Sequence, residues 1–142
     1  MGTLTVNSKT TKPAGVQWFA FFDPVTFSRI QEFELKNSVG CHSRLRGPAL
    51  DDENVFYINE IWESMEAHDA HLIRRINNPD IAVFVAYNKA KGIKTSKTFT
   101  LVQDDGSTMV GSFENSEGLK GAPFKKPLPW LLPQNQDNTP SA

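Results

Sequence analysis

Residues 54–62 read Asn-Val-Phe-Tyr-Ile-Asn-Glu-Ile-Trp (NVFYINEIW), and this stretch is the clearest strand in the chain. Its β-branched and aromatic residues favour extended backbone. Ser64 follows as a helix N-cap, and apolar residues then recur at helical spacing as far as Ile76. A strand that leads directly into a capped helix is therefore the centre of the predicted fold.

Upstream of this strand, residues 16–22 (VQWFAFF) form a short apolar run that predicts a buried strand. Asp23 is a good N-cap and Pro24 fits the first helical position, which predicts a helix over residues 24–36. A second strand is predicted over residues 41–46. It pairs with residues 54–62 as a hairpin with a wide loop.

Downstream, Asn78 and Pro79 repeat the pattern of N-cap followed by proline, and Gly92 is a suitable stop for that helix. Residues 97–103 (KTFTLVQ) predict a further strand. A tight-turn signal at Asp105-Gly106 lets residues 108–113 pair back as a last strand.

The element order predicts an α+β fold, a ferredoxin-like antiparallel sheet with helices on one face. We expect residues 1–14 to be a flexible N-terminal arm, residues 15–113 to be one domain, and residues 114–142 to be a Pro-rich tail. The sheet face without helices is expected to be apolar. A second copy of the chain would bury it, so the sequence predicts a homodimer.

The composition argues against several functional classes. The formal net charge is -1, with no block of basic residues, so nucleic acid is not an expected partner. No apolar run is long enough to span a bilayer, and the polar N-terminus lacks a signal-peptide core. Cys41 is the only cysteine, which excludes an internal disulfide and fits a cytoplasmic protein.

Residues 59–72 (NEIWESMEAHDAHL) resemble the antibiotic-biosynthesis monooxygenase domain of the dimeric α/β-barrel superfamily. In that pattern a strand ends in Glu-x-Trp, a capped helix follows, and a histidine comes nine residues after the tryptophan. Glu60, Trp62, Ala67 and His71 occupy the matching positions, and the resemblance covers roughly residues 16–103. It implies a dimeric barrel and an enzyme that oxygenates electron-rich aromatic molecules without a metal or other cofactor.

Three residues are candidate catalytic groups. Trp62 can donate its indole N–H to a substrate oxygen, although a core aromatic at a strand end is the simpler interpretation. His71 can act as a general base or can tie the helix to the sheet. His68 lies on the apolar stripe of its helix with Met65 and Leu72, where a histidine is costly unless it is paired or faces a cavity.

Four further residues are candidate substrate-binding groups: Tyr57, Asn59, Phe84 and Arg44. Some oxygenating relatives carry an asparagine four residues before the tryptophan, a position held here by Ile58. Asn59 is next to it and points to the opposite face of the strand. An arginine such as Arg44 or Arg46 can hold a phenolate or carboxylate. The two helix histidines lack further ligands in the sequence, and no metal site is expected.

Four functions remain open at this level. The first is a cofactor-independent monooxygenase-like enzyme acting on a quinol or aromatic polyketide. The second is a non-redox cyclase or isomerase on the same scaffold. The third is a dimer that binds haem or another small molecule, and the fourth is a structural dimer whose Pro-rich tail docks a partner.

Overall fold

The computed structural model describes residues 2–114, and the predicted Pro-rich tail lies outside the described residues from position 115 onward. The strands are β1 (Thr3–Thr11), β2 (Cys41–Pro48), β3 (Val55–Trp62), β4 (Lys94–Val102) and β5 (Thr108–Glu114). The helices are α1 (Phe19–Phe22), α2 (Pro24–Asn37), α3 (Met65–Ile76) and α4 (Pro79–Lys91).

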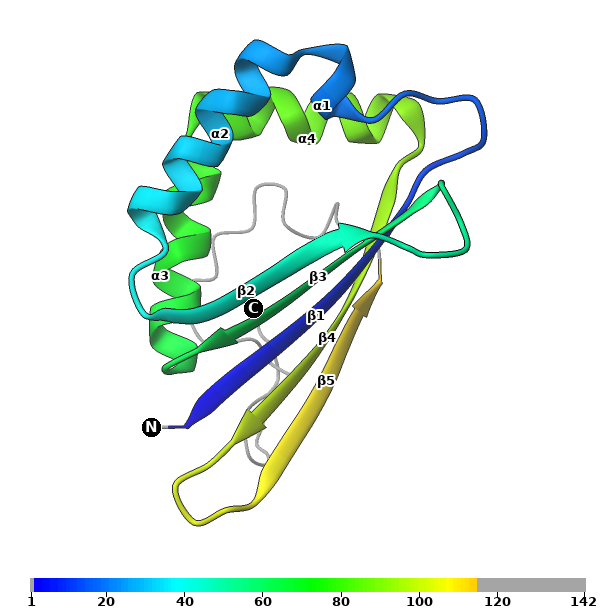
Figure 1. Ribbon diagram of the computed structural model, residues 1–142. Coiled ribbons are helices and arrows are strands. Elements are labelled where there is room, and N and C mark those ends of the chain that lie inside the picture. The colour runs from blue at the N-terminus through cyan, green and yellow to red at the C-terminus, as the bar shows by residue number, and fades with distance from the viewer. Residues whose placement is uncertain (1, 115–142) are drawn as a thin grey trace.

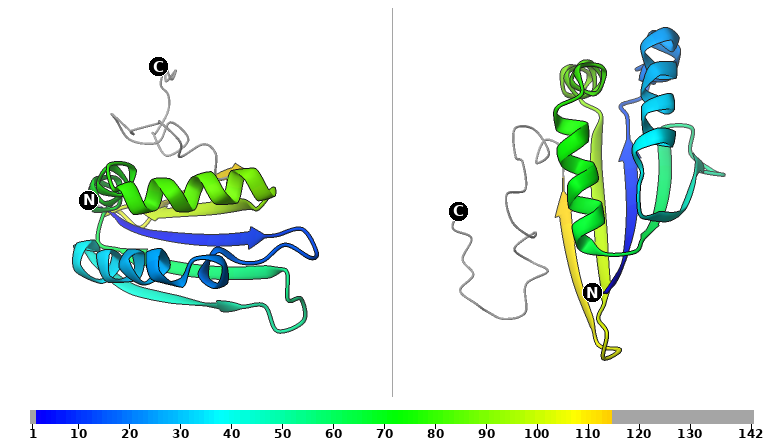
Figure 2. Two further views of the ribbon diagram at one scale, coloured as in Figure 1. Left: turned by 90° about the horizontal axis from the view of Figure 1, so that it is seen from above. Right: turned by 90° about the vertical axis from the view of Figure 1, so that its left-hand side faces the viewer.

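The strands form one antiparallel sheet in the order β2-β3-β1-β4-β5, and the helices lie on one face of it (Figure 1). Strands β1 to β4 with their helices follow the β-α-β-β-α-β order and the strand arrangement of the ferredoxin-like fold. Strand β5 extends the sheet as a hairpin with β4. Seen from above, α2 and α4 run side by side across the sheet (Figure 2). The predicted fold class is therefore confirmed.

Residues 3–11 form the central strand, so the prediction of a flexible N-terminal arm over residues 1–14 is wrong. Strand β1 pairs with β3 on one side and with β4 on the other. Leu4 and Val6 are almost fully buried, because alternate residues of a strand face the helices. The many Thr, Lys and Ser residues suggested a polar tail. Threonine, however, is β-branched and suits a sheet with one open face.

The apolar run at residues 16–22 is also a correction, because it contains the single-turn helix α1 and no strand. The place of the first strand is already taken by β1. Phe19 packs between α2 and α4, with ring centroids 5.3 Å from both Phe84 and Tyr87. The aromatic residues of this run therefore pack in a helical layer above the sheet.

The predicted helix starts are confirmed by the N-cap hydrogen bonds. Asp23 accepts from the backbone N–H of Thr26, and Ser64 accepts from that of Ala67. Asn78 accepts from the N–H groups that open α4, and α4 ends at Gly92, which has a φ of 75°. These local signals need no tertiary context, since each cap satisfies N–H groups of its own helix.

The core is divided into two apolar clusters. One lies on the sheet around Trp62 and Phe99 at the end of β3 and β4, and the other lies among α1, α2 and α4 around Phe19 and Ile81. Charged and polar side chains of the sheet, α2 and α3 lie between the two clusters and surround a cavity. This interruption of the apolar core positions the candidate site.

The sheet face without helices is mostly uncharged and rich in threonine, which corrects the expectation of an apolar surface. Exposed apolar side chains on this face are Leu45, Tyr57, Ile61, Val102 and Val110. Thr, Ser and Asn side chains separate them on β1 and β4.

None of the described helices is long and apolar enough to cross a bilayer.

Candidate functional site

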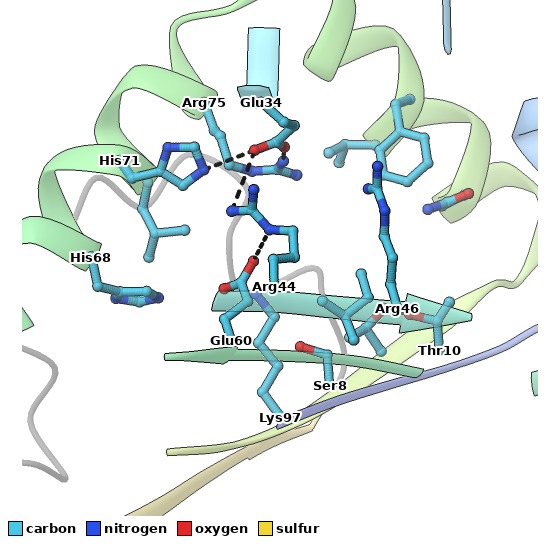
Figure 3. Close-up of a pocket in the computed structure, with 16 residues that line it drawn as sticks. Ser8, Thr10, Glu34, Arg44, Arg46, Glu60, His68, His71, Arg75 and Lys97 are labelled. Carbon is cyan, nitrogen blue, oxygen red and sulfur yellow. Dashed lines mark hydrogen bonds and ion pairs between the residues drawn. The ribbon is translucent and has the colours of Figure 1, made fainter. Parts of the chain in front are cut away.

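A cavity of about 150 Å³ lies between the sheet and the helices (Figure 3). Its floor is made by β1 to β4, and its walls by α2, α3 and α4. Apolar side chains form part of its lining, including Leu72 of α3 and Phe84 of α4. The rest is polar or charged: Ser8, Thr10, Glu34, Arg44, Arg46, Glu60, His68, His71, Arg75, Asn88, Thr95 and Lys97.

The strand register explains why so many charges meet here. Arg44 lies opposite Glu60 across β2 and β3, so both side chains rise from the same face of the sheet. Arg44 Nε donates to Glu60 Oε2 over 2.7 Å, and its Nη1 donates to Ser38 Oγ over 2.9 Å. Although burial raises the pKa of Glu60, Arg44 and the Trp62 N–H together hold it below its ordinary value. Glu60 is therefore ionised and compensated.

A second ion pair joins α2 to α3. The Arg75 guanidinium donates to Glu34 Oε2, and the Glu34 residue is only 8% exposed. Burial lowers the pKa of Arg75 to about 10, which leaves it protonated at neutral pH. A buried carboxylate held in this way ties the two helices together.

His71 has both ring nitrogens engaged. Nδ1 lies 2.9 Å from the carbonyl oxygen of Asn37, which can only accept, so Nδ1 is the donor. Nε2 lies 2.9 Å from Glu34 Oε1 and forms a hydrogen bond only when a proton lies between the two atoms. Burial and the nearby Arg44 lower the pKa of His71 to about 4, so the ring is neutral at pH 7 and Nε2 carries no proton of its own. His71 thus joins α3 to the end of α2.

His68 is placed differently, although it is only three residues away. It is 2% exposed and lines the cavity, with Nδ1 at 3.2 Å from Asp69 Oδ1. Burial, assisted by Lys97, lowers the pKa of His68, so the ring is neutral at pH 7. If Nδ1 carries the proton and donates to Asp69, Nε2 has a free lone pair. No residue within 2–114 forms a hydrogen bond to that nitrogen.

Trp62 is fully buried beneath the two histidines, and its ring centroid is 5.7 Å from that of His68 and 5.1 Å from that of His71. Its indole N–H donates to Glu60 Oε1 over 3.0 Å. The donor that the sequence analysis assigned to a substrate oxygen is therefore already used. Trp62 orients Glu60 and packs against the histidines.

Lys97 rises from β4 into the cavity between β1 and the Glu60 side chain (Figure 3). Burial and the neighbouring Arg75 lower the pKa of Lys97 to about 8. In the described part of the chain, no hydrogen bond or ion pair holds its ammonium group. An ammonium of this kind is still mostly protonated at pH 7 and is available to an anion.

Arg46 stands at the other end of the cavity from His68 (Figure 3). It comes from β2, two residues after Arg44, and so shares the same face of the sheet. Asn88 of α4 also lines the cavity and is only 8% exposed. No described residue forms a hydrogen bond to the side-chain amide of Asn88 or to the Arg46 guanidinium.

The structure brings together four of the seven residues singled out from the sequence, namely His68, His71, Arg44 and Phe84. Trp62 lies directly behind the cavity. Tyr57 and Asn59 are exposed on the opposite face of the sheet, because they alternate with the cavity residues Ile58 and Glu60 along β3. They cannot contact a molecule in this cavity.

Sequence reasoning missed Glu34, Arg75, Asn88 and Lys97. Lys97 carried a usable signal, because it stands at the same strand parity as Phe99 and Leu101, so the alternation directs its side chain toward the helices. Glu34 and Arg75 carried none, since ordinary helix surfaces hold the same residues. Three His, Cys, Asp or Glu side chains that could hold a metal do not converge anywhere in residues 2–114.

A scan against protein-family models and a search of curated proteins gave no match. The chain is similar to a solved structure of a conserved protein from Bacteroides thetaiotaomicron, described as a possible oxidoreductase. The identity is 16% and the TM-score 0.48, over 80% of this chain and 97% of that one.

Two further solved structures are similar to the chain. One is a candidate antibiotic biosynthesis monooxygenase from Deinococcus radiodurans, with 16% identity and a TM-score of 0.47, over 80% of this chain and 93% of that one. The other is SnoaB, a cofactor-independent oxygenase from Streptomyces nogalater, with 15% identity and a TM-score of 0.46, over 80% of this chain and 92% of that one.

Proposed function

We propose that the cavity is the active site of a cofactor-independent monooxygenase-like enzyme that acts on a phenol or quinol of about one ring. The observation that carries this proposal is that one cavity holds both a neutral, buried histidine and a lysine that no described residue pairs with. The resemblance of residues 59–72 to the antibiotic-biosynthesis monooxygenase domain supplies the class of reaction.

The size of the cavity limits the substrate. A cavity of about 150 Å³ is comparable to one that holds a benzene molecule, whereas drug-sized ligands occupy roughly 300–1,000 Å³. A one-ring molecule matches this volume. The fused rings of an anthrone, or a haem, exceed this space, so the proposal narrows the substrate range to small phenols.

The chemistry needs a base and a partner for the anion that forms. His68 Nε2 removes a proton, and the ammonium of Lys97 stabilises the resulting phenolate. The electron-rich ring carbon of the phenolate reacts with O₂, and a C–O bond forms to give a hydroperoxide. Loss of water then leaves a quinone. One oxygen atom stays in the product and the other leaves as water, and the substrate supplies all four electrons that reduce O₂.

The remaining charged residues hold this arrangement in place. Glu60 is oriented by Arg44 and Trp62, and the His71–Glu34–Arg75 group fixes α3, which carries His68, against α2. Fixed hydrogen bonds and ion pairs of this kind keep a base in position at little cost during the reaction. His71 is a positioning residue in this proposal.

The direct test is oxygen uptake with a panel of one-ring phenols and quinols, with anthrone for comparison. We expect uptake with a one-ring substrate and none with anthrone. His68→Gln should lower kcat by about 10²–10⁴-fold, the usual contribution of a general base. It should also abolish the acidic limb of the pH profile. His42→Gln changes an exposed histidine of β2 outside the cavity lining and should leave kcat unchanged.

A wild-type protein that consumes no oxygen above the buffer rate with any one-ring substrate would sink the proposal. An alternative hypothesis is a non-redox enzyme that uses the same base and the same partner for the anion but no O₂. A product of unchanged mass would identify that enzyme as an isomerase or cyclase. Mass spectrometry of the product under labelled oxygen gas separates the two reactions.

A further inference from the structure

The charged groups of the cavity do not balance. The two carboxylates are each paired with an arginine, Glu60 with Arg44 and Glu34 with Arg75. Both histidine rings have a lowered pKa and add no firm positive charge at neutral pH. Lys97 and Arg46 are therefore left without an ion-pair partner in the described part of the chain, Arg46 being the more exposed of the two.

The two cations stand at opposite ends of one row of the sheet. The register aligns Arg46 with Ile58, Ile58 with Ser8, and Ser8 with Lys97. Three strand spacings separate the ends of this row, roughly 14 Å between Cα atoms. The side chains in between, Ile58 and Ser8, are uncharged and also line the cavity.

A neutral polar group of the cavity lining is also without a hydrogen-bond partner. Asn88 of α4 is buried and lines the cavity, yet its amide has no hydrogen-bond partner among residues 2–114. Among residues 2–114 the only sealed side-chain atom without a partner is Arg74 Nε, so the Asn88 amide opens into the cavity, where a ligand or water can satisfy it. An amide N–H and a guanidinium that line the same cavity are donors suited to the two oxygen atoms of a carboxylate.

We infer that Arg46 and Asn88 form a carboxylate subsite in the cavity, so that the natural ligand is a one-ring organic acid whose other end lies at Lys97 and His68. This inference rests on the proposed function for the reacting end alone. The carboxylate end is a binding property that can be measured without turnover. In this inference Arg46 and Asn88 select the ligand by binding its carboxylate, and Lys97 takes part in the reaction.

The test is a calorimetric titration of the full chain at pH 7 with benzoate and with benzamide, its neutral counterpart. We expect benzoate to bind one per chain, at least tenfold tighter than benzamide. Arg46→Gln should weaken benzoate at least tenfold and leave benzamide unchanged. Asn88→Asp, which places a negative charge beside the subsite, should weaken benzoate at least as much.

Lys9→Gln is the matched control, because Lys9 is an exposed cation of β1 that points away from the cavity. It should leave benzoate binding unchanged. Equal affinity for benzoate and benzamide, no measurable benzoate binding, or equal losses in Arg46→Gln and Lys9→Gln would each overturn the subsite. If Arg46→Gln does not fold, its thermal transition will be missing. Arg46→Lys, which keeps the positive charge, then takes its place, and we expect it to lose part of the benzoate affinity.

The two proposals fail separately. Benzoate has no phenol to oxidise, so its binding is independent of any oxygen chemistry. Benzoate binding without oxygen uptake by phenols would retain the subsite and remove the monooxygenase-like reaction. Oxygen uptake by neutral phenols without benzoate binding would have the opposite meaning.

Discussion

His68 and His71 lie three residues apart on one helix and differ in what their ring nitrogens contact. His71 is held on both sides, by the Asn37 carbonyl and by Glu34, while His68 meets only Asp69 at one nitrogen. A base needs a free lone pair, so contacts rather than residue type separate the two roles. The same reasoning moves Trp62 from a substrate donor to a partner of Glu60.

At the scale of single residues, a testable prediction concerns the effect of Lys97 on stability. Its pKa in the folded protein is about 8, below the ordinary value of 10.5, because burial and Arg75 disfavour its charge. Below pH 8 the folded state therefore carries the full cost of the buried charge. Between pH 8 and 10.5 the unfolded chain binds more protons than the folded one, so this contribution to the free energy of unfolding rises with pH.

Lys97→Met removes that cost. We expect the variant to be more stable than the wild type at pH 7, by about 1–3 kcal/mol, and the difference to shrink as pH rises to 10.5. Urea unfolding at pH 7 and pH 10 measures it. Lys94→Met at the exposed start of β4 is the control, with no change expected at either pH. A difference that is constant or grows with pH would show that the charge of Lys97 is not the cause.

At the scale of the elements, strand β1 is the main revision. It occupies the centre of the sheet and holds Leu4 and Val6 against Trp62, Phe99 and Leu101. The sequence alone suggested a polar arm because only its alternate residues are apolar. A strand with one open face shows this alternation of apolar and polar residues. Such alternation is weaker evidence for a strand in the sequence than a continuous apolar run is.

Leu4→Ala tests the strand. Leu4 is fully buried, so the substitution should lower the free energy of unfolding by about 2–5 kcal/mol through lost contacts and a cavity. Thr5→Ala is the neighbouring control on the open face, with an expected change within about 1 kcal/mol. Chemical denaturation of both variants measures the pair. Similar small values for both would mean that residues 3–11 are not packed as a central strand.

At the scale of the whole molecule, the homodimer stays a prediction. The open face of the sheet carries few charges, and its apolar side chains lie on β2, β3, β4 and β5. Depletion of charge is typical of the centre of an interface, and a second copy would cover this face and close the sheet edges into a barrel. Tyr57 and Asn59 would then lie at the interface and away from the cavity.

Sedimentation velocity at micromolar concentration tests the dimer. We expect a mass of two chains for the wild type and of one chain for Ile61→Lys, which places a charge in the middle of the open face. Leu35→Lys, on the exposed side of α2, should remain a dimer. A wild type that sediments as single chains would remove the predicted homodimer. It would leave the cavity and its charges as they are.

By itself the sequence determined helices α2, α3 and α4, most of the strands and the fold class, because N-caps, prolines and hydrophobic periodicity act within a few residues of the chain. Only the tertiary structure decided which charges are paired. Glu34, Arg44, Glu60, Arg75 and Lys97 come from five different elements, and their partners are set by strand register and helix packing. The excess of two positive charges in the cavity appears only when all of these pairs are counted together. No local sequence pattern contains that information, because it depends on which side chains the fold brings together.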